Sequence, residues 1–234
     1  MCIRDRRYGA LVWSGDIHSD WETLRRQVCA GLNMGIAGIS WWTTDIGGFS
    51  GGNPLDPAFR QLLVRWFEWG CFCPVMRLHG DRVPSTPLKN QAGETLNPTG
   101  AANEVWSFGE ENTDTLVKYI RFREAMRPYT RRVMEEAHTI GRPVMRPMFY
   151  EFPDQECCWD MKEQYMFGSD ILVAPVLYEG QTKREVYLPA GAKWTCVHDG
   201  KVYEGGQTVT ADAPLEVIPV FLRDGKLSEL VGLI

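Results

Sequence analysis

Two stretches in the first half of this chain share one pattern, a short apolar run that ends at an aspartate next to glycine. Residues 8–13 precede Asp16, and residues 37–42 precede Asp45. An apolar run that stops abruptly at turn residues is typical of a strand buried in a parallel sheet. Strands that alternate with helices build a parallel sheet or a barrel, so the pattern predicts an α/β fold.

Helices are expected after both strands. Ser19 with Glu22 three residues later forms a capping box, and apolar residues at helical spacing follow it as far as Asn33 and Gly35. Residues 57–69 show the same apolar spacing and are closed by Gly70.

The second half of the chain changes character along its length. Residues 80–102 are polar and rich in Pro, Thr, Asn and Gly, which predicts a long surface loop. A long helix is expected from a cap at Asn112 or Thr113, with a kink at Pro128 and an end at Gly141. A third strand follows over residues 144–149. After residue 153, short β runs alternate with Gly, Pro and Asp turns, which predicts an antiparallel β domain.

Charge and hydropathy exclude two classes of partner. The net charge is −5 with 24% charged residues, so the chain offers no basic face large enough to neutralise a phosphate backbone, and nucleic acid is not expected as a partner. No stretch approaches the about 20 consecutive apolar residues that a membrane span requires. The sequence sets neither an oligomeric state nor a cellular compartment.

Aromatic residues are abundant, with 9 Trp, 8 Tyr and 10 Phe, and such rings either fill a large core or stack on sugar rings. Trp66 and Trp69 lie one helical turn apart in an apolar run, which favours core packing. Trp41 and Trp42 are neighbours on an expected strand. Their side chains therefore point to opposite faces, one to a barrel interior and one to the surrounding helices.

Polar side chains gather at the expected strand ends. Asp16 and Asp45 each follow a strand, and Arg77 and His79 follow a third such segment. The carboxyl ends of barrel strands are where reacting groups meet, and Trp13 and Phe49 supply apolar walls next to the two acids (Phe49 beside Asp45). Any one of these residues alone also fits a helix cap or a surface ion pair.

This set of residues suits cleavage of a glycosidic bond. That reaction needs a carboxyl group that protonates the leaving oxygen, a second that attacks or directs water, and polar groups that hold the sugar hydroxyls. A carboxyl beside Trp13 in a partly apolar pocket has its acid form favoured. A metal site built from Asp16, His18, Asp45 and His79 is a weaker alternative, because no H-x-H or H-E-x-x-H spacing is present. No metal is therefore expected, and with no phosphate loop or dinucleotide fingerprint, no cofactor either.

Ordered motifs along the chain give this set a family resemblance. The run from Arg7 to Asp16 resembles the W-x-G-D segment of glycoside hydrolase family 31, and the segments at 45–49 and 74–79 resemble its D-I-x-G-F and P-x-x-R-x-H segments. Further segments at 104–109, 127–129, 141–147, 164–168, 172–176 and 186–189 continue the resemblance into the β region.

The resemblance implies a fold and a site. The fold is the C-terminal part of a (β/α)8 TIM barrel over residues 1–153, followed by an antiparallel β-sandwich domain over residues 154–234. The site has Asp16 as general acid/base, and Trp13, Asp45, Phe49, Arg77 and His79 around the sugar.

The resemblance also implies an activity, that of a retaining α-glycosidase acting on α-glucosides or α-xylosides, with an oligosaccharide or glycoside as partner. The family's nucleophile lies in a W-x-D-M-N-E type segment, which this sequence lacks, and residues 1–6 fit no element of the fold. We therefore expect a fragment that is inactive alone. A non-catalytic carbohydrate-binding or scaffold remnant of the same fold is the alternative.

Overall fold

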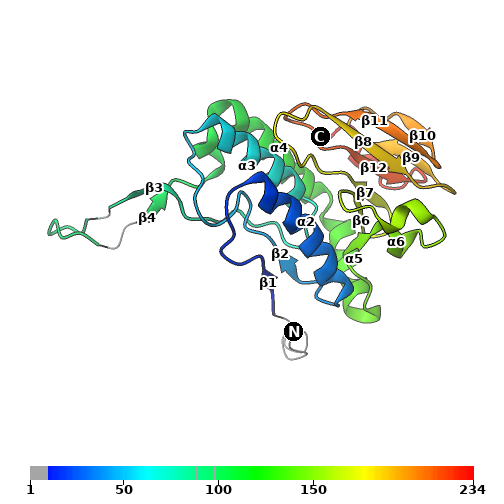
Figure 1. Ribbon diagram of the computed structural model, residues 1–234, viewed down its shortest axis with the longest axis horizontal. Coiled ribbons are helices and arrows are strands. Elements are labelled where there is room, and N and C mark those ends of the chain that lie inside the picture. Colours follow the sequence, from blue (N-terminus) through cyan, green and yellow to red (C-terminus); the bar gives the residue numbers. More distant parts are fainter. Residues whose placement is uncertain (1–9, 88, 97–98) are drawn as a thin grey trace.

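The structure is a computed structural model that describes residues 10–87, 89–96 and 99–234 (Figure 1). An N-terminal region of strands and long helices is followed by a β-rich region. The first contains β1 (Val12–Trp13), α2 (Trp21–Ile36), β2 (Trp42–Thr43), α3 (Pro57–Gly70), β3 (Arg82–Thr86), β4 (Thr99–Ala101), η1 (Val105–Phe108), α4 (Glu110–Ala125) and α5 (Arg127–Ile140). The second contains β5 (Met145–Pro147), α6 (Met148–Glu151), η2 (Glu156–Trp159), β6 (Tyr165–Phe167), β7 (Ile171–Val173), β8 (Lys183–Leu188), β9 (Lys193–Cys196), β10 (Val202–Glu204), β11 (Gln207–Asp212), β12 (Val220–Arg223) and η3 (Ser228–Leu230).

Three parallel segments lie side by side in the N-terminal region. β1 pairs with β2 in parallel register, with Val12 opposite Trp42. Residues 75–83 lie along the other side of β2, where the Ile46 N–H donates to the Arg77 carbonyl (3.2 Å) and parallel bridges join Ile46 to Leu78 and Ser50 to Asp81. The strand, helix, strand order predicted from the sequence is therefore present.

The boundary between α2 and β2 differs from the prediction. The helix runs to Ile36 instead of stopping at Asn33 to Gly35, and the strand begins at Trp42 instead of residue 37. Gly38 has a left-handed backbone (φ +81), and the Ile39 N–H donates back to the Met34 carbonyl (2.8 Å). Residues 37–39 therefore end the helix and do not continue the strand.

Two helix starts also differ from the prediction. The cap of α2 is Asp20, whose carboxylate accepts from the Thr23 N–H (2.7 Å), so Ser19 is not the cap. α4 begins at Glu110, two residues before the expected cap at Asn112, whose side chain instead donates to the Phe108 carbonyl (2.9 Å). The expected break at Pro128 and the end at Gly141 are confirmed.

The tryptophans divide between core and surface. Trp66 and Trp69 of α3 are fully buried, as expected from their helical spacing. Trp42 is also buried and lies 6.0 Å from Trp69 between ring centroids, facing the helices, whereas Trp41 is 50% exposed on the other side of the strand. A side chain at position 31 would collide with the Trp42 ring, 2.8 Å from a Cβ there, so Gly31 allows α2 to approach β2 closely.

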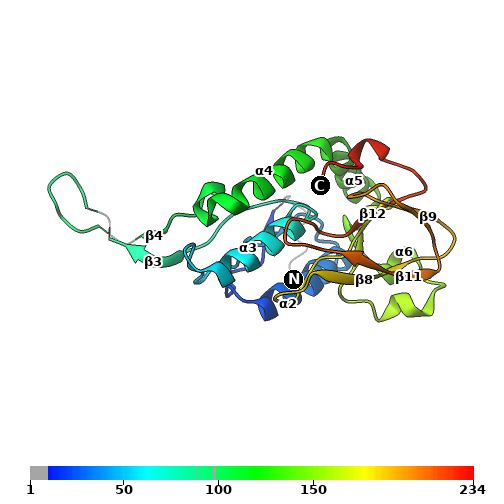
Figure 2. The ribbon, with the colours of Figure 1, turned by 90° about the horizontal axis from the view of Figure 1, so that it is seen from above.

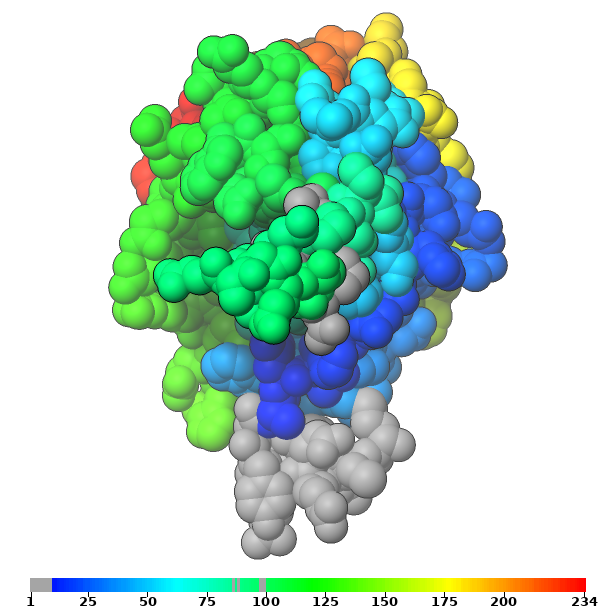
Figure 3. Space-filling model, turned by 90° about the vertical axis from the view of Figure 1, so that its left-hand side faces the viewer, coloured from blue at the N-terminus to red at the C-terminus, as the bar shows by residue number. Residues whose placement is uncertain are grey.

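The segment expected to be a loop at residues 80–102 contains an antiparallel hairpin of β3 and β4. The hairpin projects far from the body of the molecule (Figure 1), and Figure 3 shows the molecule from the side on which it projects. Its base, at Arg82 and Ala101, adjoins the ends of the parallel segments.

The β-rich region is built around a six-stranded antiparallel sheet in the order β10-β9-β12-β7-β6-β5, with β8 and β11 as a separate pair. Its central strands β6, β7 and β12 are buried on both faces, and the β-rich region lies at the end of the molecule opposite the β3–β4 hairpin (Figure 2). Tyr165, Ile171 and Val220 belong to the core that contains the helices, whereas Met166, Leu172 and Phe221, each one residue later, face the core beneath β8. This alternation is what a strand buried on both sides requires.

The domain boundary between residues 153 and 154 stays a prediction. β5 pairs antiparallel with β6, so the strand expected at residues 144–149 lies in the six-stranded sheet and not with the parallel segments.

No helix among the described residues is long and apolar enough to cross a membrane.

Candidate active site

The ends of the three parallel segments bring the candidate residues together. The Phe49 and Ser50 N–H groups both donate to the Ile17 carbonyl (2.8 and 2.9 Å), which fixes the loop after β2 against the segment that contains Asp16. The third segment places Arg77 and His79 beside Asp45 and Phe49. The side chains expected at three separate strand ends therefore share one edge.

Asp45 is the most constrained of these residues. Its side chain is fully buried, and its Oδ1 lies 3.1 Å from the Arg77 Nη1. Among the described residues, neither carboxyl oxygen has a hydrogen-bond partner. The backbone N–H of Asp45 donates to the Ser14 Oγ (3.1 Å). A buried carboxylate with free lone pairs is prepared to accept hydrogen bonds from a ligand.

Burial raises the pKa of the Asp45 carboxyl above its ordinary value, and the positive charges of Arg77 and His79 only partly offset this effect. The negative charge of Asp16 raises the pKa of Asp45 further. The Asp45 carboxyl therefore lies close enough to Asp16 to respond to its charge.

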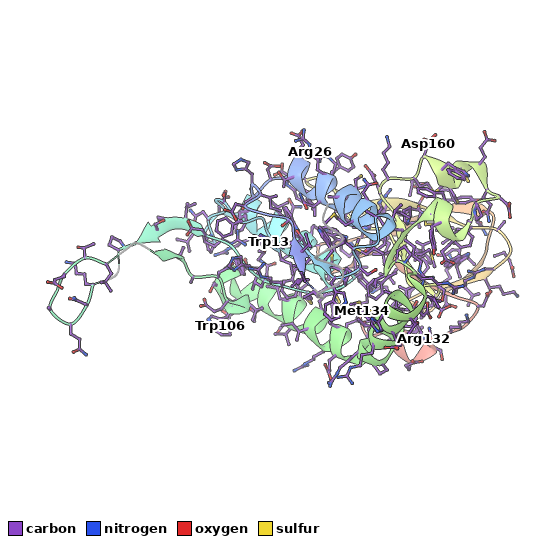
Figure 4. All side chains as sticks on the ribbon, turned by 90° about the horizontal axis from the view of Figure 1, so that it is seen from below. Trp13, Arg26, Trp106, Arg132, Met134 and Asp160 are labelled. Carbon is purple, nitrogen blue, oxygen red and sulfur yellow. The ribbon has the colours of Figure 1, made fainter. Side chains whose placement is uncertain are left out.

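Asp16 and Trp13 are more open than expected. The Asp16 side chain is exposed, and Trp13 on β1 is 50% exposed on the side of the molecule that Figure 4 shows. The partly apolar pocket predicted for Asp16 is not formed by the described residues, because only three parallel segments surround it.

Phe49 and His79 form one wall of the site. Their ring centroids lie 5.4 Å apart at an interplanar angle of 39°, and both side chains are half-buried. His18, which entered the metal alternative, is exposed. Among the described residues, no group of three or more His, Cys, Asp or Glu side chains is arranged to hold a metal ion.

Sequence reasoning missed two residues that shape this site, Ser14 and Arg82. The Ser14 hydroxyl oxygen accepts a hydrogen bond from the Asp45 N–H, and Arg82 is fully buried beneath the loop that contains Phe49. An arginine in a polar, Pro-rich stretch is typical of the surface. Gly80, two residues earlier, is one nearby signal of close packing.

Two family models match this chain. Residues 4–132 match the TIM-barrel domain of the glycosyl hydrolases of family 31, and residues 141–227 match the C-terminal domain of the same family. This chain belongs to glycoside hydrolase family 31. The family resemblance and the predicted fold class are thereby confirmed: a TIM-barrel part is followed by a β-rich domain.

Relatives within family 31 are considerably longer than this chain. The α-xylosidase of Saccharolobus solfataricus is 39% identical over 227 residues, which are 97% of this chain and 29% of that protein. Alpha-glucosidase 2 of Bacillus thermoamyloliquefaciens is 34% identical over 220 residues, 94% of this chain and 25% of that protein. The crystal structure of a family 31 α-xylosidase from a soil metagenome, complexed with xylose, superposes with a TM-score of 0.92 at 55% identity, covering 97% of this chain and 34% of that chain.

This family 31 chain therefore spans about a quarter to a third of the relatives that it matches. The roles of Asp16, Trp13, Asp45, Phe49, Arg77 and His79 stay predictions from the sequence.

Proposed function

We propose that this chain provides the acid/base side of the active site of a retaining α-glycosidase. The observation that supports the proposal most is the buried Asp45 carboxyl with two unpartnered oxygens, which lies beside Arg77 at the shared edge of three parallel segments in a family 31 chain, where exposed Asp16 also lies. The nucleophile is expected from a segment that this sequence does not contain, since a double displacement needs two carboxyl groups in the reacting position.

Asp16 is proposed as the general acid/base because its carboxyl is open to an approaching glycosidic oxygen, while Asp45 is enclosed. Asp45 is proposed to accept hydrogen bonds from sugar hydroxyls through its two unpartnered oxygens, with the positive charge of Arg77 favouring its ionised form. Trp13, Phe49 and His79 would contact the apolar faces and remaining hydroxyls of the same sugar.

The proposed substrate is an α-xyloside, with α-glucosides second. Two of the relatives described above are α-xylosidases, at 39% and 55% identity, and the α-glucosidase is 34% identical. The preference rests on that difference in similarity.

The proposal is tested in the full-length protein that contains this chain, with Asp16→Ala. Removal of a general acid should reduce turnover of isoprimeverose by between about 100-fold and 10,000-fold. Turnover of α-xylosyl fluoride should fall far less in its glycosylation step, because fluoride departs without a proton donor.

Asp20→Ala is the matched control. Asp20 is also an exposed aspartate near the end of this segment, but it caps α2, so its loss should cost about 1 kcal/mol of stability and leave turnover intact. Unchanged rates in Asp16→Ala, or equal losses with both substrates, would contradict the assignment. Tight sugar binding without turnover by the unaltered protein would favour the non-catalytic alternative.

A further inference from the structure

Arg82 lies fully buried under the loop of residues 46–52, called here the glycine-rich loop. Its guanidinium donates to five backbone carbonyl oxygens at 2.8–3.3 Å, those of Ile46, Gly47, Gly48, Gly51 and His79. Its Nε donates to the Asn103 side-chain oxygen (2.9 Å), and its Nη1 reaches the Ser19 Oγ (3.4 Å). Every side of the guanidinium is thus occupied by the protein itself, which leaves no donor for a substrate.

The surrounding residues leave room for the guanidinium and for little else. A Cβ at Gly80 would lie 2.6 Å from the Arg82 Cζ, and a Cβ at Gly47 would lie 2.8 Å from its Nη2. The Phe59 ring lies on another side, 5.0 Å from the Cζ to the ring centroid. Burial lowers the pKa of Arg82 to about 10, which still leaves it charged at neutral pH, and the charges of Asp45 and Asp81 favour the charged form.

The glycine-rich loop forms backbone hydrogen bonds with Ile17 and Asp81, and Arg82 binds it in addition through its carbonyl oxygens. Gly47, Gly48, Gly51 and Gly52 all have positive φ, between +78° and +88°. This backbone turns several carbonyl oxygens toward one point, where they repel each other unless a cation lies between them. A planar fork with five N–H groups matches that arrangement, whereas a lysine ammonium offers three donors from one atom.

The carbonyls that Arg82 holds belong to the segments that form the site. Ile46 follows Asp45 directly, and Gly48 precedes Phe49. The His79 carbonyl is bound by the same guanidinium, while the His79 ring faces the Phe49 ring. One buried cation therefore connects the backbone beside Asp45, Phe49 and His79.

We propose that Arg82 is a positioning residue of the sugar site, which holds the glycine-rich loop so that Asp45, Phe49 and His79 meet the substrate in one fixed arrangement. This inference rests on the function proposed above. Because the Arg82 donors are all used within the protein, its effect on the reaction passes through the loop.

The kinetic test uses Arg82→Met and Arg82→Lys in the full-length protein. A misplacement of pocket groups by about 1 Å costs about 100-fold, so we expect kcat/KM for isoprimeverose to fall by about 100-fold in Arg82→Met, with a clear rise in KM. Arg82→Lys should restore little of this loss, because one ammonium cannot span the five carbonyls. Wild-type kinetics in Arg82→Lys would overturn the inference.

Arg65→Met is the matched control. Arg65 is also a fully buried arginine, and it donates to the carbonyls of Ala213, Gln181 and Val217, on the side of α3 that faces the β-rich region. Its loss should lower the melting temperature and the yield of folded protein but leave KM unchanged. A rise in KM that is equal in both methionine variants would mean that Arg82 acts only through stability, which would overturn the inference.

A second readout is independent of turnover. Amide hydrogen exchange of residues 46–52 should become faster in Arg82→Met and stay unchanged in Arg65→Met. Gly80→Ala, which displaces the guanidinium without removing its charge, should reproduce the faster exchange and the raised KM, and it decides the question if Arg82→Met does not fold.

The outcomes separate the two proposals. A wild-type protein that cleaves neither xylosides nor glucosides refutes the proposed function and, with it, any role of Arg82 in that reaction. An active wild type whose Arg82 and Gly80 variants keep normal KM and normal loop exchange refutes the inference about Arg82 alone.

Discussion

Replacing Glu68 with glutamine removes the charge from a carboxyl group that is completely buried on α3. The Arg65 Nη1 lies 3.1 Å from one Glu68 oxygen, and the other oxygen has no hydrogen-bond partner among the described residues. Burial raises the pKa of Glu68 to about 7, since the loss of hydration outweighs the attraction of Arg65. The native protein thus favours the neutral carboxyl, which glutamine imitates.

The size of the effect follows from that pKa. Below about pH 4.5 the carboxyl is protonated in both the folded and the unfolded chain, so its pKa shift has no effect on stability. Between about pH 4.5 and 7 the unfolded chain releases the proton that the native protein keeps, and stability falls as the pH rises. Each pKa unit is worth about 1.4 kcal/mol, so the destabilisation above pH 7 reaches about 3 kcal/mol.

We expect Glu68→Gln to be more stable than the wild type by up to about 3 kcal/mol at pH 8 and equal to it within about 0.5 kcal/mol at pH 4.5. For a chain of this size that corresponds to a rise in Tm of roughly 6–12 °C at pH 8. Thermal melts and urea titrations of both proteins at half-unit pH steps measure the difference. The difference should grow between about pH 4.5 and 7 and level off above the raised pKa.

Glu124→Gln is the control, because Glu124 is an exposed member of an ion pair on α4 with Arg127 of α5. Its effect should stay within about 0.5 kcal/mol at every pH. A Glu68→Gln protein that is less stable than the wild type at pH 8 would refute the reasoning, because it would mean that the attraction of Arg65 exceeds the cost of burial. A difference that is independent of pH would refute it too.

Two further substitutions test the packing between α5 and the six-stranded sheet. Gly168→Ala should destabilise the protein by about 1–3 kcal/mol in urea unfolding, because the new Cβ would lie 2.3 Å from the Tyr129 Oη. Gly180→Ala is the control, since Gly180 has a similar φ but no atom within 4 Å of its Cβ position, so this variant measures the backbone cost alone. Equal losses of stability in the two variants would contradict the steric explanation. Asp170→Asn should cost about 1–3 kcal/mol at pH 7. Burial of Asp170 raises its pKa, but hydrogen bonds from Lys226, Arg132 and Ser169 outweigh this and lower it, so the stabilisation is present above about pH 4 and disappears as the pH falls further. Urea unfolding at pH 7 and pH 3 measures it, and an equal difference at both would contradict the ion pairing.

Sequence periodicity located the elements whose structure follows from local spacing. α3 starts at Pro57 and buries Trp66 and Trp69 as its apolar spacing predicts, and Gly141 ends α5 in a left-handed conformation. The approach of Asp45 to Arg77 was also predictable, because parallel strands end at one edge.

Other features depend on contacts between distant residues. The burial of Arg82 comes from carbonyls more than thirty residues earlier, which no local pattern of the polar stretch at 80–102 contains. The choice of Asp20 over Ser19 as the α2 cap leaves the Ser19 hydroxyl within reach of the same guanidinium. The exposure of Asp16 likewise depends on which segments pack around it, and the spacing of residues along the chain does not specify that packing.

The alternation along β6, β7 and β12 limits how this molecule can be divided or altered. Tyr165, Ile171 and Val220 belong to the core that contains the helices, and the residue after each of them belongs to the second core. The sheet therefore separates two hydrophobic cores and contributes side chains to both. Cutting the chain near residue 141, between the two family domains, would expose the apolar face of the sheet that packs against the helices. Deletion of a single residue within β7 would turn every later side chain of that strand to the opposite face of the sheet, and so into the wrong core.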